Sequence, residues 1–206
     1  MSDFSLSFDG KDGGTIRVDA DISMVSPEQC TFKVSEPLYP EHSAHFSGKD
    51  QSQGSPLVDK LFDLDNINDI LVANDKLTLN LKSGTWEDTV PKIGAIIHGV
   101  LTSDEAPVSD AVTSAMLPSD EVRNLVQKVL DDMINPAVAS HGGFVNLLAV
   151  TDNNVVLEFG GGCQGCGMAN VTLKYGVERT IREHVPGVGE ILDSTDHATG
   201  VNPYYK

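Results

Sequence analysis

The chain has 206 residues, of which 40% are hydrophobic and 21% charged, an ordinary balance for a globular protein with room for two small domains. Its 30 acidic residues outnumber 14 Lys and Arg, and a net charge of −16 argues against nucleic acid as a partner, because phosphate binding needs clustered cations. No apolar run is long enough to span a bilayer, and the acidic start Met1-Ser2-Asp3-Phe4 is unlike a transit peptide. We therefore expect a cytoplasmic protein without membrane contact.

The first half of the chain carries both strand and helix signals. Apolar residues that alternate with polar ones predict strands, turn residues near 73–75 predict a hairpin, and apolar residues at helical spacing predict two helices. The expected strands cover residues 15–22, 31–34, 67–72 and 76–81, and the expected helices begin at Pro56 and Trp86. This pattern predicts a small α+β domain over residues 1–103.

The first half offers no set of residues suited to catalysis. Its histidines are scattered, and we expect His42 and His45 on a surface loop. Cys30 has no partner at the spacing of metal ligands, and free cysteine is among the most buried residue types, so we expect an inert buried thiol there. We assign no catalytic or metal-binding role to this half.

A mixed segment separates the two halves. Residues 102–109 combine small, acidic and proline residues without sustained periodicity, which indicates a linker. Residues 111–117 are apolar enough to pack on a neighbour or to form a short helix. We place the linker at residues 104–117 and the second domain at residues 118–206, so the expected architecture is two small α+β domains.

The second half begins with an amphipathic helix. Ser119 is a good N-cap, acidic residues fill the first turn, and an apolar stripe that includes Met133 runs to Ile134 before Pro136 ends the helix. A turn at residues 141–143 follows. Beyond it we expect strands at 144–150, 155–159 and 188–192, and a second helix from Cys166 to about His184.

The most specific motif of this half is the glycine-rich segment at residues 160–167, which places Cys163 and Cys166 three residues apart between a strand and a helix. Both sulfurs can face one metal centre, and the glycines let backbone amides approach them closely. Two thiolates fill only half of a four-cysteine site, and Cys30 belongs to the other domain. A second copy of the chain would complete the set, so the motif predicts a homodimer that shares an iron-sulfur cluster or a structural zinc ion.

A redox-active disulfide is the main alternative for the Cys163 and Cys166 pair, because thioredoxin-like proteins also place such a pair between a strand and a helix. A helix N-terminus stabilises thiolate, which suits both metal ligation and nucleophilic sulfur chemistry. Against the disulfide, the domain is too short for a thioredoxin-like sheet, and no aromatic residue directly precedes Cys163. A zinc-bridged dimer uses the same ligands and stays open as well.

Three motifs of the second half occur in the order found in a known family. They are His141-Gly142-Gly143, then Gly162-Cys163-Gln164-Gly165-Cys166, then Thr172-Leu173-Lys174-Tyr175-Gly176-Val177-Glu178. Residues 119–193 thereby resemble the NifU carboxy-terminal domain, and residues 20–101, with Pro56-Leu57 and Trp86, resemble the amino-terminal domain of Nfu scaffold proteins. An acidic residue often follows the paired glycines in that family, where this chain has Phe144.

The resemblance implies an iron-sulfur cluster scaffold or carrier, and not an enzyme. Cys163 and Cys166 of two chains would hold one [4Fe-4S] cluster per homodimer, with no catalytic residue, and client cysteines would replace one pair of ligands during transfer to an apo-protein. The amino-terminal domain would recognise clients or upstream cluster assembly factors. His141 would serve either as a turn residue or as a hydrogen-bond donor to the cluster.

Overall fold

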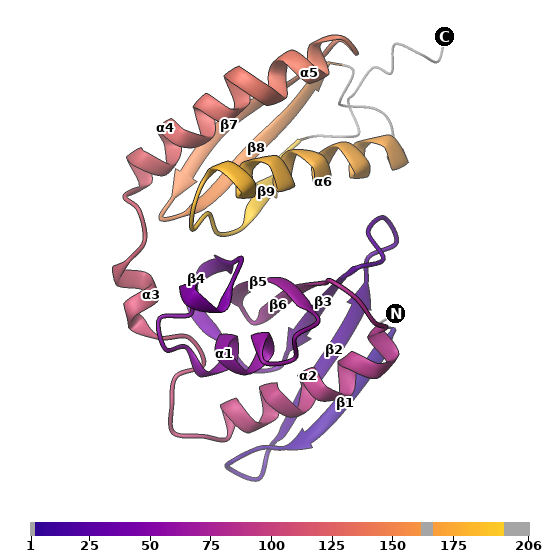
Figure 1. The fold of residues 1–206 in the computed structure, drawn as a ribbon, viewed down its shortest axis with the longest axis vertical. Helices are drawn as coiled ribbons and strands as arrows, with labels where there is room; N and C mark the ends of the chain where they lie inside the picture. The colour runs from indigo at the N-terminus through magenta and orange to yellow at the C-terminus, as the bar shows by residue number, and fades with distance from the viewer. Residues whose placement is uncertain (1–2, 162–166, 196–206) are drawn as a thin grey trace. The chain divides into compact units, whose positions relative to one another are not determined.

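The structure, a computed structural model, describes residues 3–161 and 167–195. The chain divides into two compact units, Met1–Met116 and Leu117–Lys206, each with its own sheet and its own hydrophobic core (Figure 1). Both units combine sheet and helices, which confirms the expected α+β class. No helix in the two described ranges is long and apolar enough to cross a membrane.

A six-stranded antiparallel sheet forms the first unit. Its strands in chain order are β1 (Phe4–Asp9), β2 (Thr15–Ile22), β3 (Gln29–Val34), β4 (Tyr39–Phe46), β5 (Ile67–Asn74) and β6 (Lys76–Leu81). Across the sheet they follow the order β1-β2-β3-β6-β5-β4. The prediction of β2 and of the β5–β6 hairpin is confirmed, whereas β1 and β4 are additional to the strands that the sequence predicts.

The strand β4 corrects the expectation for two histidines. His42 and His45 lie in this strand and not on a surface loop. Nε2 of His45 is 3.3 Å from Oδ1 of Asp69 on the neighbouring strand β5. Glu41, near the start of β4, has a φ of 62°, which interrupts the alternation of side chains that would mark a strand in the sequence.

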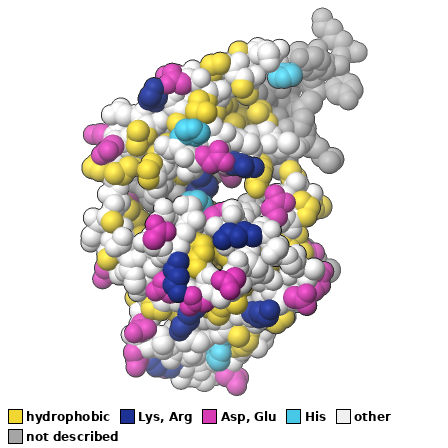
Figure 2. Space-filling view, viewed as in Figure 1, with side chains coloured by type: hydrophobic (Ala, Val, Ile, Leu, Met, Phe, Trp, Pro, Cys, Tyr) yellow, Lys and Arg dark blue, Asp and Glu magenta, His cyan; other side chains and the backbone are white. Residues whose placement is uncertain are grey.

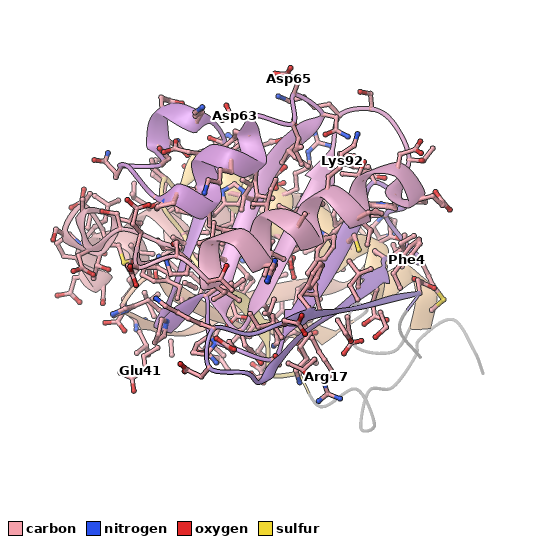
Figure 3. All side chains as sticks on the ribbon, turned by 90° about the horizontal axis from the view of Figure 1, so that it is seen from below. Phe4, Arg17, Glu41, Asp63, Asp65 and Lys92 are labelled. Carbon is pink, nitrogen blue, oxygen red and sulfur yellow. The ribbon has the colours of Figure 1, made fainter. Side chains whose placement is uncertain are left out.

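Helices cover one face of this sheet. They are α1 (Pro56–Phe62) and α2 (Trp86–Leu101), with a short 3₁₀ turn η1 (Lys49–Gln51) before them. Figure 3 shows Lys92 on α2 and Arg17 on β2 pointing to opposite sides of the sheet. The fully buried side chains between sheet and helices include Ile16, Phe32, Leu57, Leu61, Ile70, Leu77, Leu79, Ile93 and Ile97.

The segment between the two expected domains packs on the first unit. It contains the short helix α3 (Asp110–Ser114). Val108 and Val112 are only 3% and 8% exposed and belong to the core of the first unit. The chain passes from one compact unit to the other between residues 116 and 117.

The second unit places helices on one face of a three-stranded sheet. Its elements are α4 (Ser119–Val129), the π-helical turn η2 (Leu130–Ile134), α5 (Asn135–Ala139), β7 (Gly143–Thr151), β8 (Asn154–Gly161), α6 (Gly167–His184) and β9 (Ile191–Asp193). The strand order is β7-β8-β9, with β7 antiparallel and β9 parallel to β8. Its core includes Val122, Val126, Leu130, Val145, Val155, Leu157, Phe159 and Ile181.

Pro136 does not end the first helical segment of the second unit, so that expectation is wrong. The N–H of Asn135 donates to the carbonyl of Leu130, five residues earlier, which is the bond of a π-helix. This wider turn accommodates a proline, which lacks an N–H and clashes with the preceding turn of a regular α-helix. It also shifts the phase of the helix, and Met133, expected in the buried stripe, is 43% exposed.

Candidate metal centre

The cysteine motif falls between β8, which ends at Gly161, and α6, which begins at Gly167. Cys163 and Cys166 themselves lie outside the described residues. The structure therefore describes the elements on both sides of the two cysteines, namely the end of β8 and the beginning of α6. In the sequence Cys166 directly precedes α6, and the N-terminal end of a helix favours negative charge.

Gly161 at the end of β8 fits against the beginning of β7. It pairs with Gly143 and has a φ of 60°, a left-handed conformation that favours glycine. A Cβ atom at this position would lie 2.1 Å from the carbonyl oxygen of Gly142. Only glycine fits at this position, because the backbone of Gly142 and Gly143 lies directly against it.

The side chain of Phe144 covers the preceding residue of β8. Phe144 pairs with Gly160, and a Cβ atom on Gly160 would lie 2.0 Å from Cζ of the phenylalanine ring. The absence of a side chain on Gly160 therefore makes room for the ring. Phe144 remains 45% exposed, so an aromatic surface lies beside the entrance to the cysteine segment.

Asn135 ties the helical layer to the beginning of β7. Its side-chain oxygen accepts a hydrogen bond from the N–H of Val145 (2.8 Å), and its side-chain nitrogen donates to the carbonyl of Val145 (3.1 Å). Because β7 is an outer strand, this side chain satisfies backbone groups that no neighbouring strand of the sheet reaches. The sequence reasoning missed this residue, although a single polar side chain in the apolar run 133–139 is a signal for it.

Charged side chains connect α6 to the last strand. Burial raises the pKa of the Glu178 carboxyl. The charges of Arg182 and Lys174 oppose this rise, and the charge of Asp193 on β9 adds to it. Arg182 also donates a hydrogen bond to the carbonyl of Val188 (3.0 Å) and so links the helix to the segment that leads into β9.

The remaining candidates are Cys30 and His141. Cys30 is fully buried in β3, as expected, and burial, with the nearby charges of Asp21 and Asp3, raises its pKa to about 12. His141 lies in the turn before β7, where its backbone N–H donates to the carbonyl of Val138, and its role toward a cluster stays a prediction. Within residues 3–161 and 167–195, no three or more His, Cys, Asp or Glu side chains form a group that could hold a metal ion.

Known protein families match both units. The family described as "NifU-like domain" matches residues 126–192, and the family described as "Scaffold protein Nfu/NifU N terminal" matches residues 24–104. The first match includes β7, β8 and α6 together with Cys163 and Cys166, and the second runs from just before β3 to beyond the end of α2.

Three curated relatives share the name "Fe/S biogenesis protein NfuA". The relative from Xanthomonas euvesicatoria pv. vesicatoria is 56% identical over 80 residues, which are 38% of this chain. The relative from Xylella fastidiosa is 53% identical over 88 residues, which are 41% of this chain. The chain spans less than half the length of these two relatives, 40% and 44%. The relative from Stenotrophomonas maltophilia is 38% identical over 165 residues, which are 73% of this chain and 80% of that protein. The chain therefore belongs to the family of the Fe/S biogenesis proteins NfuA, with an Nfu N-terminal domain followed by a NifU-like domain.

Proposed function

We propose that the protein is an iron-sulfur cluster scaffold or carrier, in which Cys163 and Cys166 of two copies hold one [4Fe-4S] cluster and pass it to apo-proteins. The observation that carries this proposal is the match of residues 126–192 to the NifU-like domain, which includes both cysteines. The names of the relatives, Fe/S biogenesis proteins, support the same role.

The donor set of the chain suits this cargo. A [4Fe-4S] cluster is held by four cysteine thiolates, and each chain supplies two cysteines in the segment between β8 and α6. A two-fold axis through the site would bring two such pairs together. One copy alone does not complete the ligand set, so the loaded form is a homodimer.

Transfer to a client is ligand exchange and requires no catalytic residue. A client cysteine loses its proton, its thiolate binds iron, and the displaced thiolate of the carrier takes up a proton. Iron and sulfide keep their oxidation states in this exchange. Because each subunit supplies half of the ligands, replacement of one pair frees one subunit, which makes the protein a carrier and not an enzyme.

The first unit is proposed to recognise client proteins or upstream cluster assembly factors. Its one cysteine, Cys30, is buried with a pKa of about 12 and does not suit a ligand role. Deletion of residues 1–116 should leave cluster loading intact and slow transfer to a client. Equal transfer rates with and without the first unit would contradict this role.

Anaerobic reconstitution with iron and sulfide tests the proposed cluster site. The full chain is separated by size-exclusion chromatography, and iron, sulfide, zinc and protein are quantified in the same peak. We expect a dimer with about four irons and four sulfides. Cys163→Ser should lose the cluster and the dimer, whereas the control Cys30→Ala should keep both.

The other outcomes identify the alternatives for the same cysteines. A monomer without cluster would contradict the carrier function and favour a dithiol that forms a disulfide. A dimer that retains zinc and takes up no iron would make the site structural and remove cluster delivery.

A further inference from the structure

Two stretches of the second unit that carry no charge meet beside the cysteine segment. Residues 133–151 and residues 159–173 contain no Asp, Glu, Lys or Arg, although 21% of the chain is charged and its net charge is −16. The structure brings the two stretches together where Gly143 pairs with Gly161. Figure 2 shows charged side chains of both signs spread over the face in view. Most of the surface seen there is therefore not free of charge.

An exposed aromatic ring lies within this uncharged region. Phe144 is 45% exposed and packs against Gly160. Cys163 follows Gly160 by three residues, and three peptide units span at most about 11 Å between Cα atoms. Phe144 is therefore close enough to contact a molecule that approaches the cysteines.

We propose that Phe144 is a contact residue through which a second copy of the chain packs around the shared cluster; this inference rests on the proposed function. In a two-fold interface the same surface of both copies faces itself across the axis. A cluster held by both copies puts the axis at the cysteines, so the surface within about 11 Å of them lies at the centre of the interface. An aromatic side chain at such a centre is typically a large contributor to affinity.

The distribution of charge favours a second copy over a charged client as the occupant. Two copies of a chain with a net charge of −16 repel each other, and acidic groups that faced themselves across the axis would add to this repulsion. The uncharged stretches add no acidic groups to this repulsion at the place where the two copies meet.

The test compares Phe144→Ala with Leu148→Ala in the full chain. Leu148 is a matched control because it is 49% exposed on the same strand but four residues further along, about 13 Å from Phe144. After anaerobic reconstitution, analytical ultracentrifugation gives the dissociation constant of the dimer, and the loss of cluster absorbance in excess chelator gives the rate of cluster release.

For Phe144→Ala we expect the dissociation constant of the loaded dimer to rise about tenfold and cluster release to accelerate, as for truncation of an aromatic contact in an interface. Leu148→Ala should change neither quantity. Phe144→Leu, which keeps an apolar side chain over Gly160, should recover most of the affinity. The apo forms of the wild type and of Phe144→Ala should have equal melting temperatures. If Phe144→Ala melts at a lower temperature than the wild type, the comparison is made instead between Phe144→Asn and Phe144→Leu, provided that these two variants have equal melting temperatures.

The possible results separate this inference from the proposed function. If the wild type loads a cluster and Phe144→Ala holds dimer and cluster equally well, the contact role is wrong while the carrier function stands. Equal weakening by Leu148→Ala would also overturn it, because the effect would then not depend on closeness to the cysteines. A wild type that loads no cluster contradicts the proposed function and the contact role with it.

Discussion

The two units of the chain enclose their apolar side chains to different extents. The first unit closes its core between a six-stranded sheet and helices, and its exposed large hydrophobic residues among those described are Met24 and Val25, in one turn. The described part of the second unit, residues 117–161 and 167–195, has three strands and leaves more such residues exposed: Met133, Phe144, Leu148 and Leu192. The contrast shows that the larger sheet encloses its apolar side chains more completely, whereas the smaller second unit leaves single apolar side chains at its surface, one of them Phe144 beside the end of β8.

The largest expected effect comes from a cavity in either core. Ile97 and Ile181 are both fully buried, one in each unit, and truncation to Ala should cost about 4 kcal/mol of unfolding free energy. Trp86 is the single tryptophan of the chain and lies in the first core, so its fluorescence reports on that unit. In urea unfolding, Ile97→Ala should lower the fluorescence midpoint, whereas Ile181→Ala should lower only a transition seen by circular dichroism. Equal shifts of the Trp86 midpoint would show that the two units unfold as one.

The next effect concerns the strand end before the cysteines. Gly161→Ala forces a left-handed backbone on alanine and drives its Cβ atom into the carbonyl of Gly142, so we expect the second unit to lose about 3 kcal/mol. The control Gly176→Ala, on α6, has open space at its Cβ position and should be neutral or stabilising by about 1 kcal/mol. Urea unfolding followed by circular dichroism measures both. A stable Gly161→Ala protein would mean that β8 ends differently.

A smaller loss is expected from the polar link between helix and strand. Asn135→Ala removes two hydrogen bonds to the backbone of Val145 and should destabilise the second unit by about 2 kcal/mol. Asn146→Ala is the matched control, because Asn146 is exposed and makes one long contact with Glu158 (3.4 Å), and it should change stability by less than about 0.5 kcal/mol. If both variants unfold at the same urea concentration, Asn135 does not anchor β7.

The smallest expected effect depends on pH. Burial raises the pKa of Glu178, so the native state favours the protonated carboxyl. The stability that the protonated carboxyl contributes is fully present below the unfolded pKa of 4.5 and is lost as the pH rises through the folded pKa. Glu178→Gln is neutral at every pH and should therefore stabilise the second unit at pH 7 relative to the wild type, but not at pH 4. Glu183→Gln, which removes an exposed ion pair with Arg179, should change stability by less than about 0.5 kcal/mol at either pH. If Glu178→Gln raised the stability of the second unit equally at pH 4 and pH 7, the titration of Glu178 would not be the cause.

The fold could be predicted where local pattern and tertiary contacts agree. β2 coincides with the strand expected at residues 15–22, because its buried residues alternate with exposed or partly exposed ones along most of its length. β4 does not show such a pattern, since Glu41 has a left-handed backbone, and its pairing with β5 defines it instead. The helix that continues through Pro136 escaped prediction because a π-helical turn does not follow the 3.6-residue period.

The candidate site could be predicted only as far as its spacing in the sequence. Cys163 and Cys166 are named by the motif itself, and their role as ligands stays a prediction. Phe144 and Asn135 belong to other elements: Phe144 reaches the end of β8 through the register of β7, and Asn135 binds the backbone of β7 at Val145. A shift of one residue in that register would turn Phe144 to the other face of the sheet, and register depends on the packing of the whole unit.

The burial of Cys30 has a consequence for the sulfur chemistry of the whole chain. A thiol with a pKa of about 12 is almost entirely protonated at pH 7, and thiolate is the form that binds iron and reacts with oxidants. Of the three cysteine thiols in each chain, the one at Cys30 is therefore poorly reactive. For a protein proposed to handle iron and sulfide, the buried Cys30 thiol does not compete with Cys163 and Cys166 for iron, and it is poorly reactive toward oxidants.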